Sequence, residues 1–305
     1  MKNDVVIKVD NVTKDYGDKK GVFNESFEIK KGQMVGFVGT NGSGKTTTIR
    51  SILGFIKTTS GHCYVNGLES WSNSSKILKK VGYVPGEISF PDLGTGIAFI
   101  HSQAEFLHLK NFDRANYLIE KLQLDPRANL KRMSKGMKQK TALVAALMDD
   151  PEIIILDEPT TGLDPLMRES FLEIIEEEHK KGKTILMSSH MFEEIEETCD
   201  SVLLISNGHL IDHVSMQDIT HHDIKEYKIE FNKKNDYKIF QKEKYKITRL
   251  QDEYNQVTVQ IPKEQIEELF KSLKGMDLKF ISENPYTLEK HFIEKIKNVN
   301  EEGGK

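Results

Sequence analysis

A glycine-rich segment between residues 39 and 46 has the composition of a loop that binds phosphate groups. It reads Gly-Thr-Asn-Gly-Ser-Gly-Lys-Thr and directly follows the apolar run Met34–Val38. Glycines allow backbone N–H groups to surround phosphate oxygens, Lys45 supplies a positive charge, and the Thr46 hydroxyl can ligate Mg²⁺. Because an apolar strand precedes the segment, a fortuitous glycine-rich turn is the weaker interpretation. The predicted phosphate-binding residues are Gly39, Thr40, Asn41, Gly42, Ser43, Gly44, Lys45, Thr46 and Thr47.

Two adjacent acids, Asp157 and Glu158, follow a second apolar run, Ile153–Leu156. An acid at the carboxyl end of a buried strand faces the crevice in which open α/β sheets bind their ligands. Asp157 suits the ligand shell of Mg²⁺, and Glu158 is placed to polarise a water molecule against a terminal phosphate. Taken alone, paired acids at a strand end are more often part of a solvated loop. Beside a phosphate-binding loop, the catalytic interpretation is favoured.

The elements that position these residues follow the pattern of an α/β fold. Four apolar runs are each followed by a turn and a helical pattern, which predicts buried parallel strands. These runs are Val5–Val9, Gln33–Val38, Glu152–Leu156 and Lys183–Met187. Residues 94–148 have helical patterns throughout and predict an inserted helical lobe, with His101 and His108 on one helix face. The helix over 46–53 directs its N-terminal dipole at the phosphates, and Asn207-Gly208 predicts a hairpin turn.

Glycine usage marks a domain boundary near residue 214. Only three of the 21 glycines, Gly275, Gly303 and Gly304, lie after residue 215. We therefore predict a nucleotide-binding domain over 1–214, with its helical lobe at about 92–148, and a small α+β domain over 215–305. In the second domain, alternation predicts strands at Glu226–Phe231 and Gln256–Ile261, and amphipathic patterns predict helices at Lys263–Leu273 and Thr287–Ile296.

The overall composition excludes several classes of protein. The 305 residues hold 43 basic and 47 acidic side chains, a balance that does not suit a protein wrapped around a polyanion, and no nucleic-acid partner is expected. No apolar run approaches the ~20 residues of a membrane-spanning helix, and the first residues lack the apolar stretch of a secretion signal.

Cys63 and Cys199 form no CxxC pair, so we expect two small core residues. His221-His222 is more simply explained as a solvated turn than as a metal site.

Four further segments stand in order around the phosphate loop and the two acids. Tyr16 precedes the loop, Met133–Gln139 lies between the loop and the acids, and Pro159–Asp164 and Ser188–His190 follow them. Over about residues 4–214, this order resembles that of an ABC-type ATPase. In that resemblance Tyr16 stacks on adenine, Met133–Gln139 is similar to the signature LSGGQ, and Pro159–Asp164 looks like the D-loop.

The resemblance implies a P-loop NTPase cassette of the α/β class that binds ATP and Mg²⁺. It assigns Ser134 and Gly136 to the γ-phosphate, and the helical run after Ser134 predicts that this serine caps a helix. His190 resembles the switch histidine. The implied catalytic residues are then Lys45, Glu158 and His190, and the Mg²⁺ ligands are Thr46 and Asp157.

The chain departs from the family pattern at two places. The Q-loop glutamine would follow Tyr83-Val84-Pro85, where Gly86 and Glu87 stand instead. In the signature, Lys135 and Met137 replace a glycine and a glutamine, whereas Ser134 and Gly136 are retained. These departures are expected to affect how strongly ATP hydrolysis is coupled to a partner protein, and not whether the site binds ATP.

The wording Ser-Lys-Gly-Met-Lys-Gln and the C-terminal extension most resemble ATPase subunits of ABC-2-type exporters. This resemblance implies a multi-span membrane permease as partner, a homodimer or a heterodimer with another ABC ATPase, and a cytoplasmic location at the inner face of the cell membrane. Two alternatives remain open: a soluble factor acting on ribosomes or DNA, and a regulatory module that binds ATP but scarcely hydrolyses it. Soluble factors of that kind have either two fused cassettes or one cassette interrupted by a long coiled coil. This chain instead resembles a single cassette.

Overall fold

The computed structural model describes residues 4–303, which form two compact units. The first unit contains the residues up to 215 together with those from 295, and the second contains residues 216–294. The division near 215 lies beside the predicted domain boundary. The residues from 295 group with the first unit, although the sequence assigns them to the second domain. Among the described residues, no helix combines the length and the apolar character needed to cross a bilayer.

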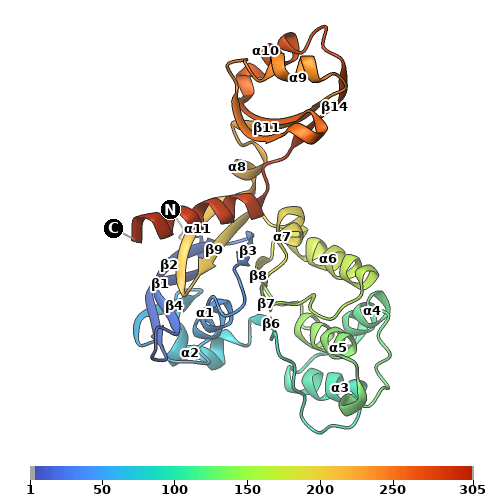
Figure 1. Cartoon of the computed structure of the whole chain (residues 1–305). Helices are drawn as coiled ribbons and strands as arrows, with labels where there is room; N and C mark the ends of the chain where they lie inside the picture. Colours follow the sequence, from blue (N-terminus) through green and yellow to red (C-terminus); the bar gives the residue numbers. More distant parts are fainter. Residues whose placement is uncertain (1–3, 304–305) are drawn as a thin grey trace. The chain divides into compact units, whose positions relative to one another are not determined.

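A six-stranded sheet forms the centre of the first unit, with the strand order β10-β9-β3-β8-β7-β6 (Figure 1). Its strands are β3 (Met34–Val38), β6 (Val81–Val84), β7 (Ile153–Asp157), β8 (Thr184–Ser189), β9 (Ser201–Ser206) and β10 (His209–Ser215). All pairs are parallel except β9 and β10, which form the hairpin predicted from Asn207-Gly208. Every residue of β3, β7 and β8 is buried, as expected for parallel strands covered on both faces.

A second sheet in the first unit is antiparallel and has the order β2-β1-β4-β5. Its strands are β1 (Val5–Asp15), β2 (Gly21–Lys30), β4 (Ser60–Val65) and β5 (Leu68–Glu69). The prediction that Val5–Val9 forms a buried parallel strand was therefore wrong. β1 returns directly into β2 through residues 16–20, and so short a connection can join only antiparallel strands.

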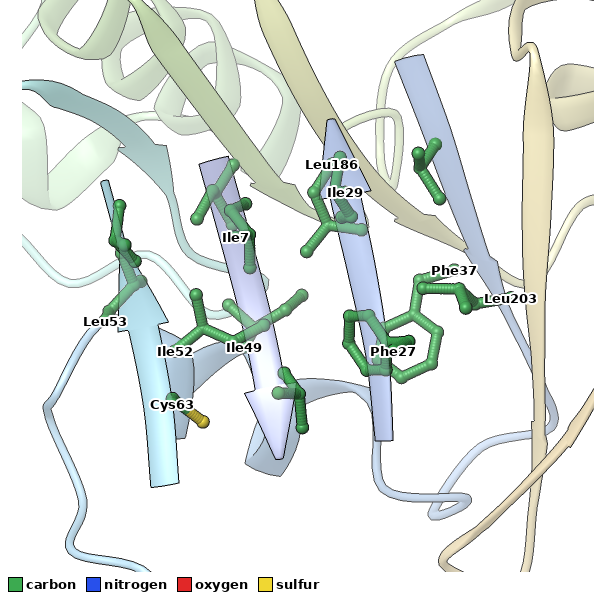
Figure 2. Close-up of a cluster of buried hydrophobic side chains, with 14 of the residues drawn as sticks. Ile7, Phe27, Ile29, Phe37, Ile49, Ile52, Leu53, Cys63, Leu186 and Leu203 are labelled. Carbon is green, nitrogen blue, oxygen red and sulfur yellow. The ribbon is translucent and has the colours of Figure 1, made fainter. Parts of the chain in front are cut away.

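The core of the first unit lies where the antiparallel sheet, the central sheet and one helix meet (Figure 2). The helix is α1 (Lys45–Ile52), which begins at the end of the phosphate loop. The fully buried side chains that pack here are Ile7 and Ile29 from the antiparallel sheet, Phe37, Leu186 and Leu203 from the central sheet, and Ile49 and Ile52 from α1. Burial of Ile49 and Ile52 therefore fixes the position of α1, the helix that begins with Lys45.

Helices surround the central sheet and form the predicted lobe. The lobe contains α3 (Gly96–Phe106), α4 (Asp113–Lys121), the 3₁₀ turn η1 (Leu130–Arg132) and α5 (Lys135–Leu147), and the remaining helices are α2 (Ser70–Ile77), α6 (Pro165–Lys180) and α7 (Phe192–Thr198). The expectation that His101 and His108 share a helix face was wrong. α3 ends at Phe106, and His108 follows it with a positive φ of 55°, outside the helix.

Glu178 of α6 joins the lobe to the central sheet. Its side chain is only 2% exposed and pairs with Arg114 of α4 at 2.8 Å, Lys183 at 2.7 Å and Lys181 at 2.8 Å. Burial alone would raise the pKa of this carboxyl, but the three cations outweigh it and lower the pKa of Glu178 to about 2. Asp150 also contacts both Arg114 and Lys183. The lobe is therefore attached by a buried ionic cluster.

Replacing Glu178 with glutamine should destabilise the protein by about 3 kcal/mol, because it leaves the buried Lys183 and the half-buried Arg114 without their main partner. Denaturant unfolding measures this loss, and Glu176→Gln, which removes an exposed i,i+4 pair with Lys180, is the matched control. The folded-state pKa lies below the ordinary value of 4.5, so the stabilisation is complete above pH 4.5 and declines as the pH falls towards 2. A difference between wild type and variant that does not shrink over this range would contradict the account.

The second unit is an α+β domain with the strand order β12-β13-β11-β14, all antiparallel. After α8 (Met216–Thr220), its elements are β11 (Ile224–Phe231), α9 (Lys234–Phe240), β12 (Lys246–Gln251), η2 (Asp252–Tyr254), β13 (Gln256–Pro262), η3 (Lys263–Gln265), α10 (Ile266–Ser272), β14 (Leu278–Asn284) and the start of α11 (Leu288–Gly303). This is the βαββαβ arrangement of ferredoxin-like domains. The predicted strands match β11 and β13, and the predicted helices match α10 and α11.

Candidate functional site

The phosphate loop connects β3 to α1 and has the backbone of an anion-binding turn. Gly42 and Gly44 have φ values of +80° and +119°, which only glycine adopts without strain. Gly44 stands at the N-cap of α1, and no side chain caps this helix end. The first N–H groups of α1 therefore have no side-chain acceptor and are available to phosphate oxygens. This observation fits the predicted binding of a nucleotide.

The β9–β10 hairpin holds the phosphate loop in place. The Gly208 N–H donates to the Ser43 carbonyl at 2.8 Å, and the Phe23 N–H donates to the Gly208 carbonyl at 2.7 Å. A methyl group at Gly39 would lie 2.3 Å from the Ile205 carbonyl, so this glycine is required for packing. The hairpin turn was predicted from its residue types, but its supporting role depends on tertiary structure.

Lys45 is only 5% exposed and points back into the loop. Its ammonium donates to the carbonyl oxygens of Gly39 at 2.8 Å and Thr40 at 3.3 Å, and lies 3.5 Å from the Glu158 carboxylate. A cation buried in this way has an electrostatic field that water screens only weakly. It can therefore stabilise the negative charge of a bound triphosphate strongly.

Asp157 lies at the end of β7, directly beside Thr46. The Thr46 hydroxyl donates to one Asp157 oxygen at 2.7 Å, and the Ser188 hydroxyl donates to the other at 2.7 Å. Asp157 is 1% exposed, so both of its oxygens have fixed positions. A hydroxyl and a carboxylate at this distance form an oxygen donor set of the kind that Mg²⁺ prefers. In the sequence, Ser188 stands out only as part of the segment of the predicted switch histidine, and its contact with Asp157 arises because β8 pairs with β7.

Glu158 adopts a left-handed backbone conformation, with φ of +49°, which is costly for a residue other than glycine. Its N–H donates to the Ser188 hydroxyl at 3.0 Å, which helps to hold this conformation. The carboxylate lies 3.1 Å from Nδ1 of His190 and accepts a hydrogen bond from the Thr161 hydroxyl at 3.3 Å. Two of the three predicted catalytic residues, Lys45 and His190, thus lie against the carboxylate of the third, Glu158.

A cavity of about 360 Å³ opens beside these groups. Its lining residues are Thr46, Arg50, Gly86, Glu87, Lys135, Asp157, Glu158 and Thr161. It therefore combines the phosphate loop, the two acids and both departures from the family pattern. A methyl group at Gly86 would lie 3.3 Å from the Asp157 carbonyl, so this glycine directly adjoins the predicted Mg²⁺ ligand. Among the described residues, neither Glu87 nor Lys135 forms an ion pair within 4 Å.

The signature segment begins the lobe helix α5 as expected. The Ser134 hydroxyl accepts a hydrogen bond from the Met137 N–H at 3.2 Å, which confirms the predicted cap. A methyl group at Gly136 would lie 2.6 Å from the Gly162 carbonyl, so the signature segment abuts the D-loop of its own chain. Gly136 therefore lies directly beside the D-loop.

Tyr16 follows β1 and presents an exposed ring. The side chain is 57% exposed, and the Lys14 ammonium lies 5.2 Å from the ring centre. An exposed aromatic ring with a cation beside it offers a surface on which a purine base can stack. The two cysteines are buried as predicted, and burial raises the pKa of both thiols to about 12.

The chain is similar in sequence to several known proteins. Residues 22–161 match the family model described as ABC transporter. The chain is 36% identical over 211 residues to the linearmycin resistance ATP-binding protein LnrL of Bacillus subtilis strain 168, covering 68% of each chain. It is 32% identical to the ABC transporter ATP-binding protein YhaQ of the same organism, covering 97% of this chain and 100% of that protein.

Among solved structures, the fold matches a dimeric post-hydrolysis state of the ATP-binding cassette MJ0796 bound to ADP and Pi. The TM-score is 0.62 at 22% sequence identity, and the match covers 69% of this chain and 98% of that one. At 22% sequence identity, this match shows that the two proteins share a fold. The match to YhaQ, in contrast, covers nearly all of both chains.

Proposed function

Since this chain belongs to the ABC transporter family of ATP-binding proteins and is an ATP hydrolase of that family, we propose that it powers export through a separate membrane permease. The observation that supports hydrolysis most directly is the convergence of Lys45, Glu158 and His190 beside the cavity at the phosphate loop. The proposed location is cytoplasmic, at the inner face of the cell membrane, through contact with the permease.

In this proposal Glu158 is the general base. Its carboxylate accepts a proton from a water molecule as that water attacks the terminal phosphate, and His190 at 3.1 Å orients the same carboxylate. Lys45 stabilises the charge on the phosphate oxygens. The hydrogen bond from Thr161 restricts the side chain of Glu158, which lines the cavity.

Thr46 and Asp157 are the proposed protein ligands of Mg²⁺. They offer one hydroxyl and one carboxylate oxygen, and Mg²⁺ typically takes only one or two protein ligands and completes its shell with water and phosphate oxygens. A metal ion held there would neutralise negative charge on the phosphates of the nucleotide. Ser188 keeps Asp157 in the orientation that places one oxygen next to Thr46.

We further propose that two cassettes share two ATP molecules, and that the second cassette is another copy of this chain. The N-terminus of α5, at Ser134 and Gly136, has the dipole and the free N–H groups of an anion site. In its own chain this helix end packs against Gly162 of the D-loop. The ATP held at the phosphate loop of a second chain would supply the anion for this site.

An apolar groove of about 270 Å³ supports the proposed permease contact. It lies between β6 and the lobe helices α3 and α5, and its aromatic lining is Tyr83, Phe90, Phe99 and Phe106. Phe106 is 76% exposed, an unusual position for a large apolar ring. We propose that a short cytoplasmic helix of the permease occupies this groove, because grooves lined by aromatic rings bind the apolar face of a helix.

The groove is connected to the catalytic cavity through one short segment. Pro85 and Ile88 line the groove, and Gly86 and Glu87 between them line the cavity. Occupation of the groove can therefore move Glu87 relative to Asp157. This gives the proposed permease a direct mechanical route to the site of hydrolysis.

The Gly86-Glu87 segment provides the experiment that tests the coupling. A glutamine at 86 would place its amide beside Asp157, so Gly86→Gln should raise the basal rate of phosphate release several-fold. Glu87→Ala should leave the basal rate within about twofold and reduce the stimulation by the co-purified membrane partner, because Glu87 acts only when the groove is occupied. Phosphate release is measured for wild type and both variants, with and without that partner in lipid vesicles.

The exposed Glu193→Ala is the matched control for loss of a carboxylate. Equal stimulation of wild type and Glu87→Ala would show that Glu87 is a bystander. A wild-type chain that binds ATP but releases no phosphate in either setting would favour the regulatory alternative, in which the missing glutamine abolishes turnover.

A further inference from the structure

Glu194 of α7 is a buried carboxylate outside the cavity that the proposed mechanism uses. The residue is 2% exposed, and the nearest cation, Nη1 of Arg168, lies 3.8 Å from its Oε1. Within residues 4–303, Oε1 has no hydrogen-bond partner. Burying a carboxylate with so little charge compensation is costly. The interactions that retain this carboxylate are therefore those of its other oxygen, Oε2.

Oε2 of Glu194 joins the two segments that hold the catalytic residues. It accepts hydrogen bonds from the Thr160 hydroxyl at 3.1 Å and from the Ser189 hydroxyl at 2.9 Å. Thr160 lies two residues after Glu158, and Ser189 directly precedes His190. A single oxygen thus connects the chain after the proposed base to the chain before the proposed switch histidine.

The bond to Ser189 also orients the backbone at His190. A serine hydroxyl has one proton, and Ser189 donates it to Glu194. Its lone pairs are then available to the Met191 N–H, which donates to Ser189 Oγ at 3.0 Å and closes the turn around His190. Without the Glu194 acceptor, the hydroxyl is free to rotate and this turn loses its fixed geometry.

We propose that Glu194 is a positioning residue for ATP hydrolysis, which holds the D-loop and the His190 turn in register so that His190 meets the Glu158 carboxylate. The inference rests on the proposed roles of Glu158 and His190. It concerns only the alignment of these groups, since Glu194 itself does not line the cavity beside the phosphate loop. Loss of alignment should therefore lower the rate of hydrolysis and leave the binding of ATP unchanged.

The test compares Glu194→Ala with Glu194→Gln. Alanine removes the acceptor, and we expect kcat to fall about 30-fold, since a displacement of about 1 Å can reduce turnover by up to 10²-fold. The Kd for ATP should stay within about twofold, because the phosphate loop is untouched. Glutamine retains one carbonyl acceptor for both hydroxyls, and kcat should recover to within about threefold of wild type. Glu193→Ala, next in sequence but exposed, is the matched control and should match wild type.

Two further variants keep the test decisive if Glu194→Ala folds poorly. Thr160→Val and Ser189→Ala each remove one donor, and each should lower kcat without changing ATP affinity. Wild-type turnover in Glu194→Ala, or an equal loss of ATP affinity and turnover in all three variants, would overturn the inference. Glu158→Gln and His190→Ala are measured alongside. If these two variants retain turnover, the proposed catalytic roles of Glu158 and His190 are wrong. If only the Glu194 variants retain turnover, the positioning role of Glu194 alone is wrong.

Discussion

Replacing Lys45 with alanine should abolish ATP hydrolysis and weaken ATP binding. The Lys45 ammonium is buried at the phosphate loop, and its loss leaves the phosphate charge and the Glu158 carboxylate without their nearest cation. We expect phosphate release to fall by about 10³-fold, the upper range for loss of one preorganised electrostatic contact. Phosphate release and equilibrium binding of ATP measure the two effects.

Lys57→Ala is the matched control, because this lysine is exposed beyond the end of α1. It should change neither quantity by more than about twofold. Turnover of Lys45→Ala within about tenfold of wild type, or ~1.4 kcal/mol of barrier, would contradict the assignment of the phosphate site.

The substitution Glu158→Gln should separate hydrolysis from binding. The amide has nearly the same shape as the carboxylate and can still contact Lys45 and His190, but it cannot accept the proton of the attacking water. Loss of a general base typically costs 10²–10⁴-fold, so we expect phosphate release to fall by at least about 10²-fold. The affinity for ATP should be unchanged or higher.

Glu152→Gln, at an exposed position directly before β7, is the matched control for this change of charge. It should keep wild-type turnover. Full turnover in Glu158→Gln would show that another residue is the base, and a parallel loss of ATP affinity would assign Glu158 to binding.

The phosphate loop and the two acids can be picked out of the sequence because the functions predicted for them depend on local residue types. Backbone curvature requires glycine, charge requires lysine, and metal ligation requires oxygen, so the pattern is visible without the fold. Val5–Val9 shows the limit of this reasoning. Its apolar run suits a buried parallel strand, but an apolar strand in an antiparallel sheet packed on a core has a similar composition.

The strands of the second unit show more clearly that composition alone does not reveal every strand or its pairing. β11 and β13 were predicted from alternating apolar side chains, most of which the structure buries, whereas β12 and β14 are largely exposed and have no apolar alternation. Pairing with a neighbouring strand, and not composition, makes them strands. The βαββαβ order could therefore not be recognised from the sequence.

The residues that support the site could not be predicted, because their roles exist only in three dimensions. Ser188 contacts Asp157 across 31 positions, and Glu194 contacts Thr160 across 34. Neither residue type has an unusual local context in the sequence. Gly208 was recognised as part of a turn, but its hydrogen bond to Ser43 depends on the packing of β9 against β3.

The central proposal, an ATP site shared by two copies of this chain, is tested most directly by sedimentation velocity of Glu158→Gln with Mg²⁺ and ATP. Because this variant binds ATP without hydrolysing it, we predict a stable dimer with ATP and a monomer with ADP. Adding Ser134→Glu to the same variant places a negative charge at the α5 N-terminus that should meet the partner's phosphates, and this double variant should remain monomeric. A monomeric Glu158→Gln with ATP bound, or a dimer that Ser134→Glu does not disrupt, would contradict the proposal.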